Sequence, residues 1–184
     1  SGMKQVLVGL QPQNLEDVIA LISLYRPGPM DSIPTYLRNR HEPDKISYKT
    51  PQLAHILDVT NGCIVYQEQV MQIFRELAGF SFGQADNVRR AMSKKKHAVM
   101  EAEREHFVHG CTEPGHECPG CVANGISEKV ANEIYDEMSS FASYAFNKSH
   151  AACYAYVAFQ TAYLKCHYPS EFMAALLTSV LDNT

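Results

Sequence analysis

The sequence concentrates positive charge in one short segment that could bind phosphate. Arg89 and Arg90 are followed by Lys94, Lys95 and Lys96, which places five cations within eight residues. Guanidinium and ammonium groups at the end of a helix commonly hold phosphate oxygens, either of a nucleic-acid backbone or of a triphosphate. The same segment also fits a solvated helix terminus, because cations are favourable near the negative end of the helix dipole. Taken alone, the basic run favours this second interpretation.

A second candidate lies where a long helix is expected to begin. Asn147, Lys148, Ser149 and His150 stand at this junction. The N-terminus of a helix presents backbone N–H groups to anions, and these side chains would add further donors, so the junction would suit a phosphate. Tyr154, one turn later, should share the face of His150 and could be a stacking platform or a core residue. The alternative is that Asn147 or Ser149 is simply a helix cap and His150 a packed side chain.

A third candidate is a group of metal-ligating residue types. Cys118 and Cys121 flank a Pro-Gly pair, with Cys111, His116 and His109 close by in the chain. Tetrahedral zinc takes four sulfur or nitrogen ligands, so the three cysteines with either His116 or His109 would close a structural Cys3His site. Four protein ligands leave no position for water, which favours a structural role over a catalytic one. The alternative is three unligated cysteines in a surface loop.

The carboxylates needed for metal-dependent nucleotidyl transfer are missing from this sequence. Such chemistry uses closely placed acidic residues, yet no two aspartates here are closer than thirteen residues. Glu101, Glu103 and Glu105 alternate, but on a helix that spacing turns them to different faces, which indicates a solvated acidic surface. The sequence also has no glycine-rich phosphate loop and no nucleophile elbow. We therefore expect no catalytic residue in this chain, and no activity from it alone.

The elements that must position these residues are helices, and the fold class is mainly α. Apolar residues recur at helical spacing in most segments, while Pro27-Gly28-Pro29 and Asn61-Gly62 mark breaks. The segment 151–162 has no polar face for three turns, so it is predicted to be the central, enclosed helix. Helices are expected at residues 14–25, 33–39, 50–59, 69–77, 84–93, 97–109, 127–141, 149–167 and 169–181, joined by long loops.

Composition limits the class of protein. The chain has 184 residues, 46% of them hydrophobic and 20% charged, as expected for one globular domain. A formal charge of -4 argues against a uniformly basic DNA-binding surface. No stretch suits a membrane span and no leader is evident, so a cytoplasmic protein without membrane partners is the default expectation. Ser1-Gly2 could be a cloning scar, and the chain is expected to be an excised piece.

Five motifs resemble the C-family bacterial replicative polymerases, in the region of the DNA polymerase III alpha subunit known as the fingers. They occur in the family's order and cover nearly the whole chain, and Ser1-Gly2-Met3-Lys4 also looks like the family's sequence, which weakens the scar interpretation. The motifs are Leu24-Tyr25-Arg26-Pro27-Gly28-Pro29-Met30-Asp31-Ser32, Val65-Tyr66-Gln67-Glu68-Gln69-Val70-Met71-Gln72-Ile73, Ala85-Asp86 with Arg89-Arg90-Ala91-Met92 and the lysine run, Phe146-Asn147-Lys148-Ser149-His150-Ala151-Ala152, and His167-Tyr168-Pro169-Ser170-Glu171-Phe172-Met173-Ala174-Ala175-Leu176.

The resemblance implies that residues 1–184 form a fingers region that closes over the incoming dNTP and the primer/template DNA. Catalytic aspartates and Mg²⁺ would belong to a palm outside this chain, and replisome subunits would bind other domains. The resemblance also assigns roles. Arg89, Arg90 and Lys94 to Lys96 look like the phosphate-binding segment; Lys148, Ser149, His150 and Tyr154 look like the face near the nascent base pair; and Arg26 with Tyr66 would border the site.

The chain departs from the commonest family pattern in two places. Residues 109–124 hold the cysteine cluster where the family usually has a short polar link, so this zinc-knuckle segment is an insertion whose role the family does not settle. Ala145 stands where a glycine is frequent, which could stiffen the chain before Phe146. The rival interpretation is a noncatalytic zinc-stapled helical module that binds nucleic acid or a protein partner. A neighbouring palm with paired aspartates would decide for the polymerase.

Overall fold

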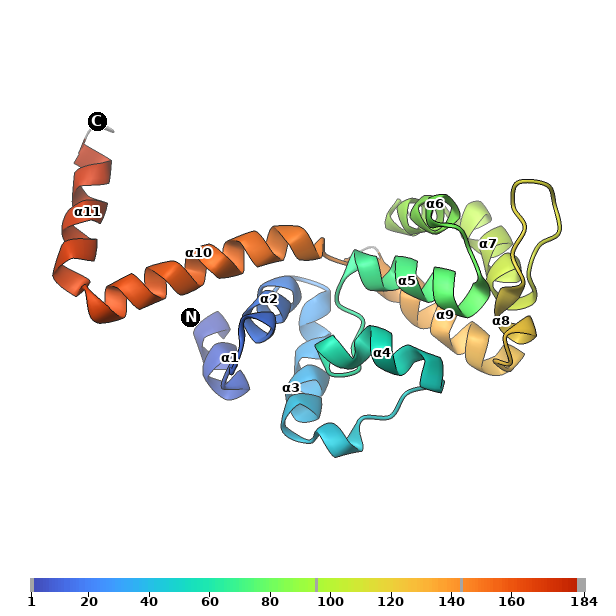
Figure 1. Cartoon of the computed structure of the whole chain (residues 1–184), viewed down its shortest axis with the longest axis horizontal. Coiled ribbons are helices and arrows are strands. Elements are labelled where there is room, and N and C mark those ends of the chain that lie inside the picture. Colours follow the sequence, from blue (N-terminus) through green and yellow to red (C-terminus); the bar gives the residue numbers. More distant parts are fainter. Residues whose placement is uncertain (1, 95, 143, 182–184) are drawn as a thin grey trace.

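The computed structural model describes residues 2–94, 96–142 and 144–181, and this part of the chain is helical without any strand. Figure 1 shows a body of two lobes, from which α10 projects and carries α11 at its far end. The helices are α1 (Gly2–Leu10), α2 (Leu15–Leu24), α3 (Ile33–His41), α4 (Ala54–Leu57), α5 (Gln67–Ala78), α6 (Phe82–Ser93), α7 (His97–His109), α8 (Gly120–Ala123), α9 (Glu128–Ala142), α10 (Lys148–His167) and α11 (Pro169–Leu181), with short 3-10 turns at Pro29–Ser32, Pro43–Lys45, Pro51–Leu53 and Asp58–Thr60.

The first lobe consists of α1, α2, α3 and the first turns of α10. α2 begins where the Asn14 side chain accepts the backbone N–H of Asp17 at 3.0 Å. The buried Asp17 carboxylate is in turn paired with Arg40 of α3 at 3.2 Å, which satisfies its charge. Side chains from all four helices make one apolar cluster, formed by Leu10, Ile19, Leu21, Leu24, Ile33, Tyr36, Ala151 and Ala155 among others.

The second lobe consists of α5 to α9 and is built around Phe74. The Phe74 side chain is fully buried on α5, and its ring lies 5.0 Å from that of Phe107 on α7 and 5.9 Å from that of Tyr135 on α9. Both pairs are edge-on, the geometry that aromatic rings prefer. The Tyr135 hydroxyl donates to the Met100 carbonyl oxygen at 2.5 Å, so its polar end is satisfied. One apolar core therefore fixes the relative positions of α5, α6, α7 and α9.

Most of the predicted helices are confirmed, with differences at several places, among them the short helix α8, which was not predicted. The helix expected at 50–59 is divided into short turns around α4, and α1 was not predicted. The segment 151–162 was wrongly predicted to be enclosed, because only Ala151 and Ala155 are buried while Tyr156, Val157 and Phe159 are exposed. α10 packs on α2 and contacts α11, and its C-terminal part extends away from the body (Figure 1). An apolar composition shows that burial of a helix would be favourable, but it does not show that another element of the same chain buries it.

No helix in the described ranges is long and apolar enough to cross a membrane.

Candidate functional site

Several of the predicted site residues lie near a point where two distant segments touch. Tyr66 and Phe146 form an isolated parallel bridge, in which the Gln67 N–H donates to the Phe146 carbonyl oxygen at 3.0 Å and the Phe146 N–H donates to that of Val65 at 3.3 Å. The bridge places the start of α5 beside the start of α10. Ala145, next to the bridge, is buried and lies outside the left-handed region, so its methyl group causes no backbone strain.

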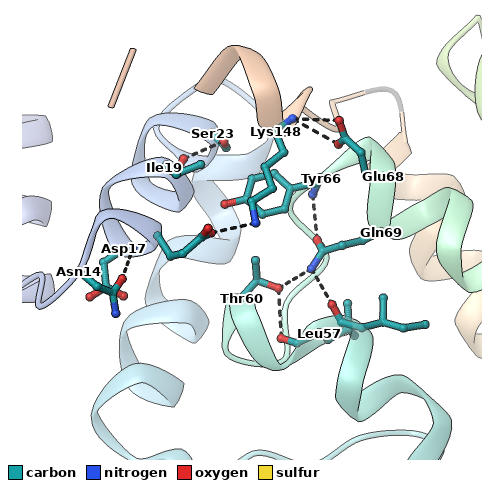
Figure 2. Close-up of polar contacts among 12 residues, drawn as sticks. Asn14, Asp17, Ile19, Ser23, Leu57, Thr60, Tyr66, Glu68, Gln69 and Lys148 are labelled. Carbon is teal, nitrogen blue, oxygen red and sulfur yellow. Dashed lines mark hydrogen bonds and ion pairs between the residues drawn. The ribbon is translucent and has the colours of Figure 1, made fainter. Parts of the chain in front are cut away.

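A buried glutamine fixes the chain that leads into this bridge (Figure 2). The Gln69 side-chain oxygen accepts the N–H groups of Val65 and Tyr66 at 2.9 and 3.0 Å. Its amide nitrogen donates to the Ile56 carbonyl oxygen at 3.1 Å and to the Thr60 hydroxyl at 2.7 Å. All of these groups are buried, so losing the glutamine would leave several of them unsatisfied. Gln69 thus holds Tyr66 in place, a role that its sequence position did not reveal.

Lys148 lies over Tyr66 and is surrounded by acids. Its ammonium nitrogen is 3.0 Å from Glu16 Oε2 and 5.3 Å from the Tyr66 ring centroid. Its backbone N–H, in the first turn of α10, donates to both carboxylate oxygens of Glu68 at 3.2 Å, as Figure 2 shows. Burial raises the pKa of Tyr66 well above its usual value, so the phenol stays neutral. A carboxylate of this same chain therefore occupies the helix terminus at which we expected an anion.

Of the remaining residues of this junction, one caps α10 and the others are exposed. The Asn147 side chain accepts the His150 N–H at 3.0 Å, so the capping interpretation of Asn147 is confirmed. The His150 ring lies 4.8 Å from the Tyr154 ring and 5.3 Å from the Phe146 ring, which confirms the predicted shared face. Ser149, His150 and Tyr154 are exposed. They form an accessible aromatic and hydroxyl surface beside the start of α10.

The basic run begins in α6, where one carboxylate holds both arginines. Asp86 Oδ1 accepts from Arg89 Nη2 at 2.7 Å, and its Oδ2 lies 2.8 Å from Arg90 Nε. The hydrogen bonds from Arg89, and then those from Arg90, lower the pKa of Asp86. Lys94 and Lys96 are exposed between α6 and α7. Lys95 lies outside the described residues.

Arg26 contacts the other side of the bridge. Its guanidinium carbon lies 4.2 Å from the Phe146 ring centroid, and Nη2 donates to the Tyr144 carbonyl oxygen at 2.6 Å. Its Nε donates to the Ser23 carbonyl oxygen at 3.1 Å. Partial burial lowers the pKa of Arg26. Arg26 and Tyr66, which were predicted to border the site, therefore both pack around the start of α10.

A cavity of about 510 Å³ brings two of the predicted candidates together. Arg89 comes from α6 and Asn147 from the start of α10, and Gln67 and Glu68 of α5 lie between them. Arg75 and Phe82 also line the cavity, and the Arg75 guanidinium carbon lies 5.8 Å from the Phe82 ring centroid. Sequence reasoning singled out none of these intervening residues, although Asp86 and Arg89 show the spacing of a helical ion pair. The cavity is lined by Gln67, Glu68, Met71, Gln72, Arg75, Glu76, Phe82, Asp86, Arg89 and Asn147.

The cysteine segment forms a tight loop between α7 and α9. Cys111 and Cys118 exchange backbone hydrogen bonds at 2.9 Å in both directions, and Cys121 is fully buried in α8 against the same core. Gly110 and Gly120 pack backbone to backbone: a Cβ at Gly120 would lie 2.3 Å from the Gly110 nitrogen. No group of three or more His, Cys, Asp or Glu side chains within the described residues is arranged to hold a metal ion. The zinc site therefore stays a prediction.

Two histidines, His116 and His109, were considered as the fourth ligand. His116 is exposed in the loop. His109 Nε2 lies 3.9 Å from carboxylate oxygens of both Glu105 and Glu128. The structure therefore does not distinguish between them as ligands.

Comparison with known proteins gives consistent matches. The model of the bacterial DNA polymerase III alpha subunit finger domain matches residues 1–115. The DNA polymerase III subunit alpha of Thermus aquaticus is 50% identical over 182 residues, 96% of this chain and 14% of the relative. The proteins of the same name from Staphylococcus epidermidis and Staphylococcus aureus are 46% identical, over 99% of this chain and 16% of each relative. The chain thus spans about a seventh of the length of these relatives.

Proposed function

Because this chain belongs to the bacterial DNA polymerase III alpha subunit finger domain family, we propose that it positions the incoming dNTP and the primer/template DNA for template-directed DNA synthesis. The observation that carries the proposal is the cavity between α5, α6 and α10. Both Arg89 of the basic run and Asn147 of the α10 junction line it, although they are far apart in the sequence. Family membership also argues against the rival interpretation, in which the chain is an unrelated, noncatalytic zinc-stapled module.

The contribution of these residues is electrostatic positioning. A triphosphate concentrates negative charge, and Arg89, Arg90 and the lysines that follow would neutralise it as the fingers close. Asp86 now balances both arginines, but each Nη of a guanidinium carries two N–H groups, so Arg89 can donate to phosphate while it keeps Asp86. The exposed His150 and Tyr154 rings offer a stacking surface beside the nascent base pair.

The chemistry of bond formation belongs to other parts of the polymerase. Paired carboxylates and Mg²⁺ would come from the palm of the same polypeptide, and this chain alone should not extend a primer. The remaining partners are primer/template DNA, the palm, and replisome subunits that bind other domains. A replicative polymerase works on the chromosome, so we place the chain in the bacterial cytoplasm.

Substitution in the complete polymerase tests the nucleotide role. Arg89→Ala and Lys148→Ala should each reduce kcat/KM for dNTP about tenfold or more, since a lost charge-assisted hydrogen bond costs roughly 1.5–3 kcal/mol. Arg38→Ala is a matched control, because it removes an arginine from the last turn of α3, an element that does not line the cavity. Normal kinetics for Arg89→Ala and Lys148→Ala would remove these residues from the site.

We also propose that residues 109–124 bind a structural zinc ion. The support is the backbone pairing that sets Cys111 opposite Cys118, with Cys121 against the same apolar core. Binding would require a local rearrangement of these side chains and of the loop, because the described arrangement does not gather a ligand set. Such a site would staple the loop between α7 and α9.

Metal analysis of the purified chain tests this second proposal. We expect about one zinc per chain, as a closed four-ligand site predicts. Zinc should be lost on Cys118→Ser and on Cys121→Ser, whereas Cys153→Ser, on the exposed part of α10, should retain it. Separate His116→Ala and His109→Ala variants identify the fourth ligand. A folded chain that takes up no zinc at micromolar concentrations would end the proposal.

A further inference from the structure

Gln67, the first residue of α5, connects the two halves of the candidate site. Its side-chain nitrogen donates to the Ala145 carbonyl oxygen at 3.0 Å, just before α10. Its side-chain oxygen accepts from Arg89 Nη1 at 2.9 Å, on α6. Its backbone N–H donates to the Phe146 carbonyl oxygen at 3.0 Å, which fixes the residue itself. One half-buried amide therefore joins three elements at the wall of the cavity.

These contacts require an amide. The carbonyl oxygen of Ala145 needs a donor and the guanidinium of Arg89 needs an acceptor, and a carboxamide presents both, on two separate atoms at its tip. A glutamate would retain the acceptor and lose the donor, and a methionine of similar length would lose both. Asp86 binds Nε and Nη2 of the same guanidinium at 3.0 and 2.7 Å. Together, Gln67 and Asp86 grip the plane of the Arg89 guanidinium from two sides.

We propose that Gln67 is a positioning residue, which holds the Arg89 guanidinium beside Asn147 and so ties α6 to the start of α10. The inference rests on the proposed function, in which Arg89 binds phosphate. An arginine side chain has many rotamers, and holding it before the ligand arrives lowers the entropic cost of binding. Gln67 itself need not touch the nucleotide. Its effect should therefore be transmitted entirely through Arg89.

Steady-state kinetics of the complete polymerase provides the first test. Gln67→Met should raise the KM for dNTP about three- to tenfold, less than Arg89→Ala does, because Asp86 still holds the arginine and the net loss is that of about one ordinary hydrogen bond. The change in kcat should be smaller, because the chemical step does not use this residue. Gln5→Met is the control, because it makes the same change at an exposed residue of α1, a helix that does not line the cavity. Its KM should stay at the parent value.

A double-mutant cycle separates positioning from a general structural role. If Gln67 acts through Arg89, then Gln67→Met should add nothing to the loss already caused by Arg89→Ala. Independent, multiplying losses would overturn the inference, as would a normal KM for Gln67→Met beside a raised KM for Arg89→Ala. A normal KM for Arg89→Ala would overturn the proposed function, and the inference with it.

A second variant covers the case in which Gln67→Met folds poorly. Gln67→Glu keeps an acceptor for Arg89, so its KM for dNTP should stay closer to the parent value than that of Gln67→Met. The reverse order of the two KM values would contradict the inference.

Discussion

Three carboxylates of this chain pair with the groups that could bind phosphate. They belong to Asp86, Glu16 and Glu68. Asp86 lies 2.7 and 2.8 Å from the two arginines of α6, and Glu16 lies 3.0 Å from the Lys148 ammonium nitrogen. Glu68 accepts the first N–H of α10. These pairs keep the cations ordered without a ligand, and Arg89 retains N–H groups that can donate to a phosphate while it keeps Asp86. At the residue scale, the groups that we propose bind phosphate are therefore ordered in advance.

The Asp86 pairing should make a pH-dependent contribution to stability. The hydrogen bond from Arg89, and then that from Arg90, lower the pKa of Asp86 in the folded chain. A depressed carboxyl pKa contributes stability above the unfolded value of about 3.9, and that stability is lost as the pH falls through the folded value. Asp86→Asn should therefore lower the free energy of unfolding at pH 7 by about 1 kcal/mol or less, because the pair is partly exposed.

Urea unfolding of the parent and of Asp86→Asn at a series of pH values measures this. The difference between the two chains should shrink below about pH 4. A difference that is equally large at pH 7 and at pH 2.5 would show that the effect is not ionic.

The elements place these residues through one extensive interface and a set of local contacts. α10 is capped by Asn147 and packs on α2, while the Tyr66–Phe146 bridge joins the chain before it to α5. The C-terminal part of α10 extends from the body and carries α11, as Figure 1 shows. The orientation of α10 and of the residues at its start therefore depends on packing against α2 together with the hydrogen bonds near the junction.

Removing the cap of α10 should have a measurable cost. Asn147→Ala takes away the acceptor for the His150 N–H, and loss of such a cap typically costs about 1 kcal/mol. Asn147→Asp keeps an acceptor and should retain most of the stability. Asn87→Ala is the control, because Asn87 is exposed in the interior of α6, where alanine is the better helix former. Thermal unfolding of all three chains checks this order. If Asn147→Ala equals the parent, the cap does not hold the helix start.

At the scale of the whole molecule, two apolar clusters hold the body together, and α10 extends from it. The Phe74 cluster orders α5 to α9, and the second cluster orders α1 to α3 with the start of α10. The bridge between Tyr66 and Phe146 lies between the two clusters, because Tyr66 belongs to the second cluster while α5, which follows it, is buried in the first. A change in the packing of the lobes would therefore move the candidate site directly.

Core and projecting residues should differ sharply in their effect on stability. Phe74→Ala removes the central ring of the larger cluster and should lower the free energy of unfolding by about 3–5 kcal/mol. Tyr156→Ala, on the exposed part of α10, should change it by less than about 0.5 kcal/mol. Chemical denaturation of the purified variants tests both values. Equal losses would mean that α10 is packed in solution as firmly as α5.

Periodicity predicted most of the helices because an apolar stripe reflects burial directly, as on α5 and α9. It failed for α10, because the apolar residues of Tyr156 to Phe159 show that a helix can be buried but not that this chain buries it. Arg89 and Asn147 were singled out from charge and capping, and both line the same cavity, while their roles toward the nucleotide stay predictions. Gln67, Asp86 and Glu68 were missed because their roles depend on contacts between distant segments, which local patterns do not encode.

Photoaffinity labelling of the complete polymerase, bound to primer/template DNA, tests the central claim most directly. A dNTP with a photoreactive group on its γ-phosphate marks the residues that surround the triphosphate, and peptide mapping locates them. We predict labelled peptides within residues 84–96 and 146–154, with labelling reduced in Arg89→Ala and competed by unmodified dNTP. Labelling of residues 1–184 only outside these two segments, or labelling unchanged by excess dNTP, would contradict the account.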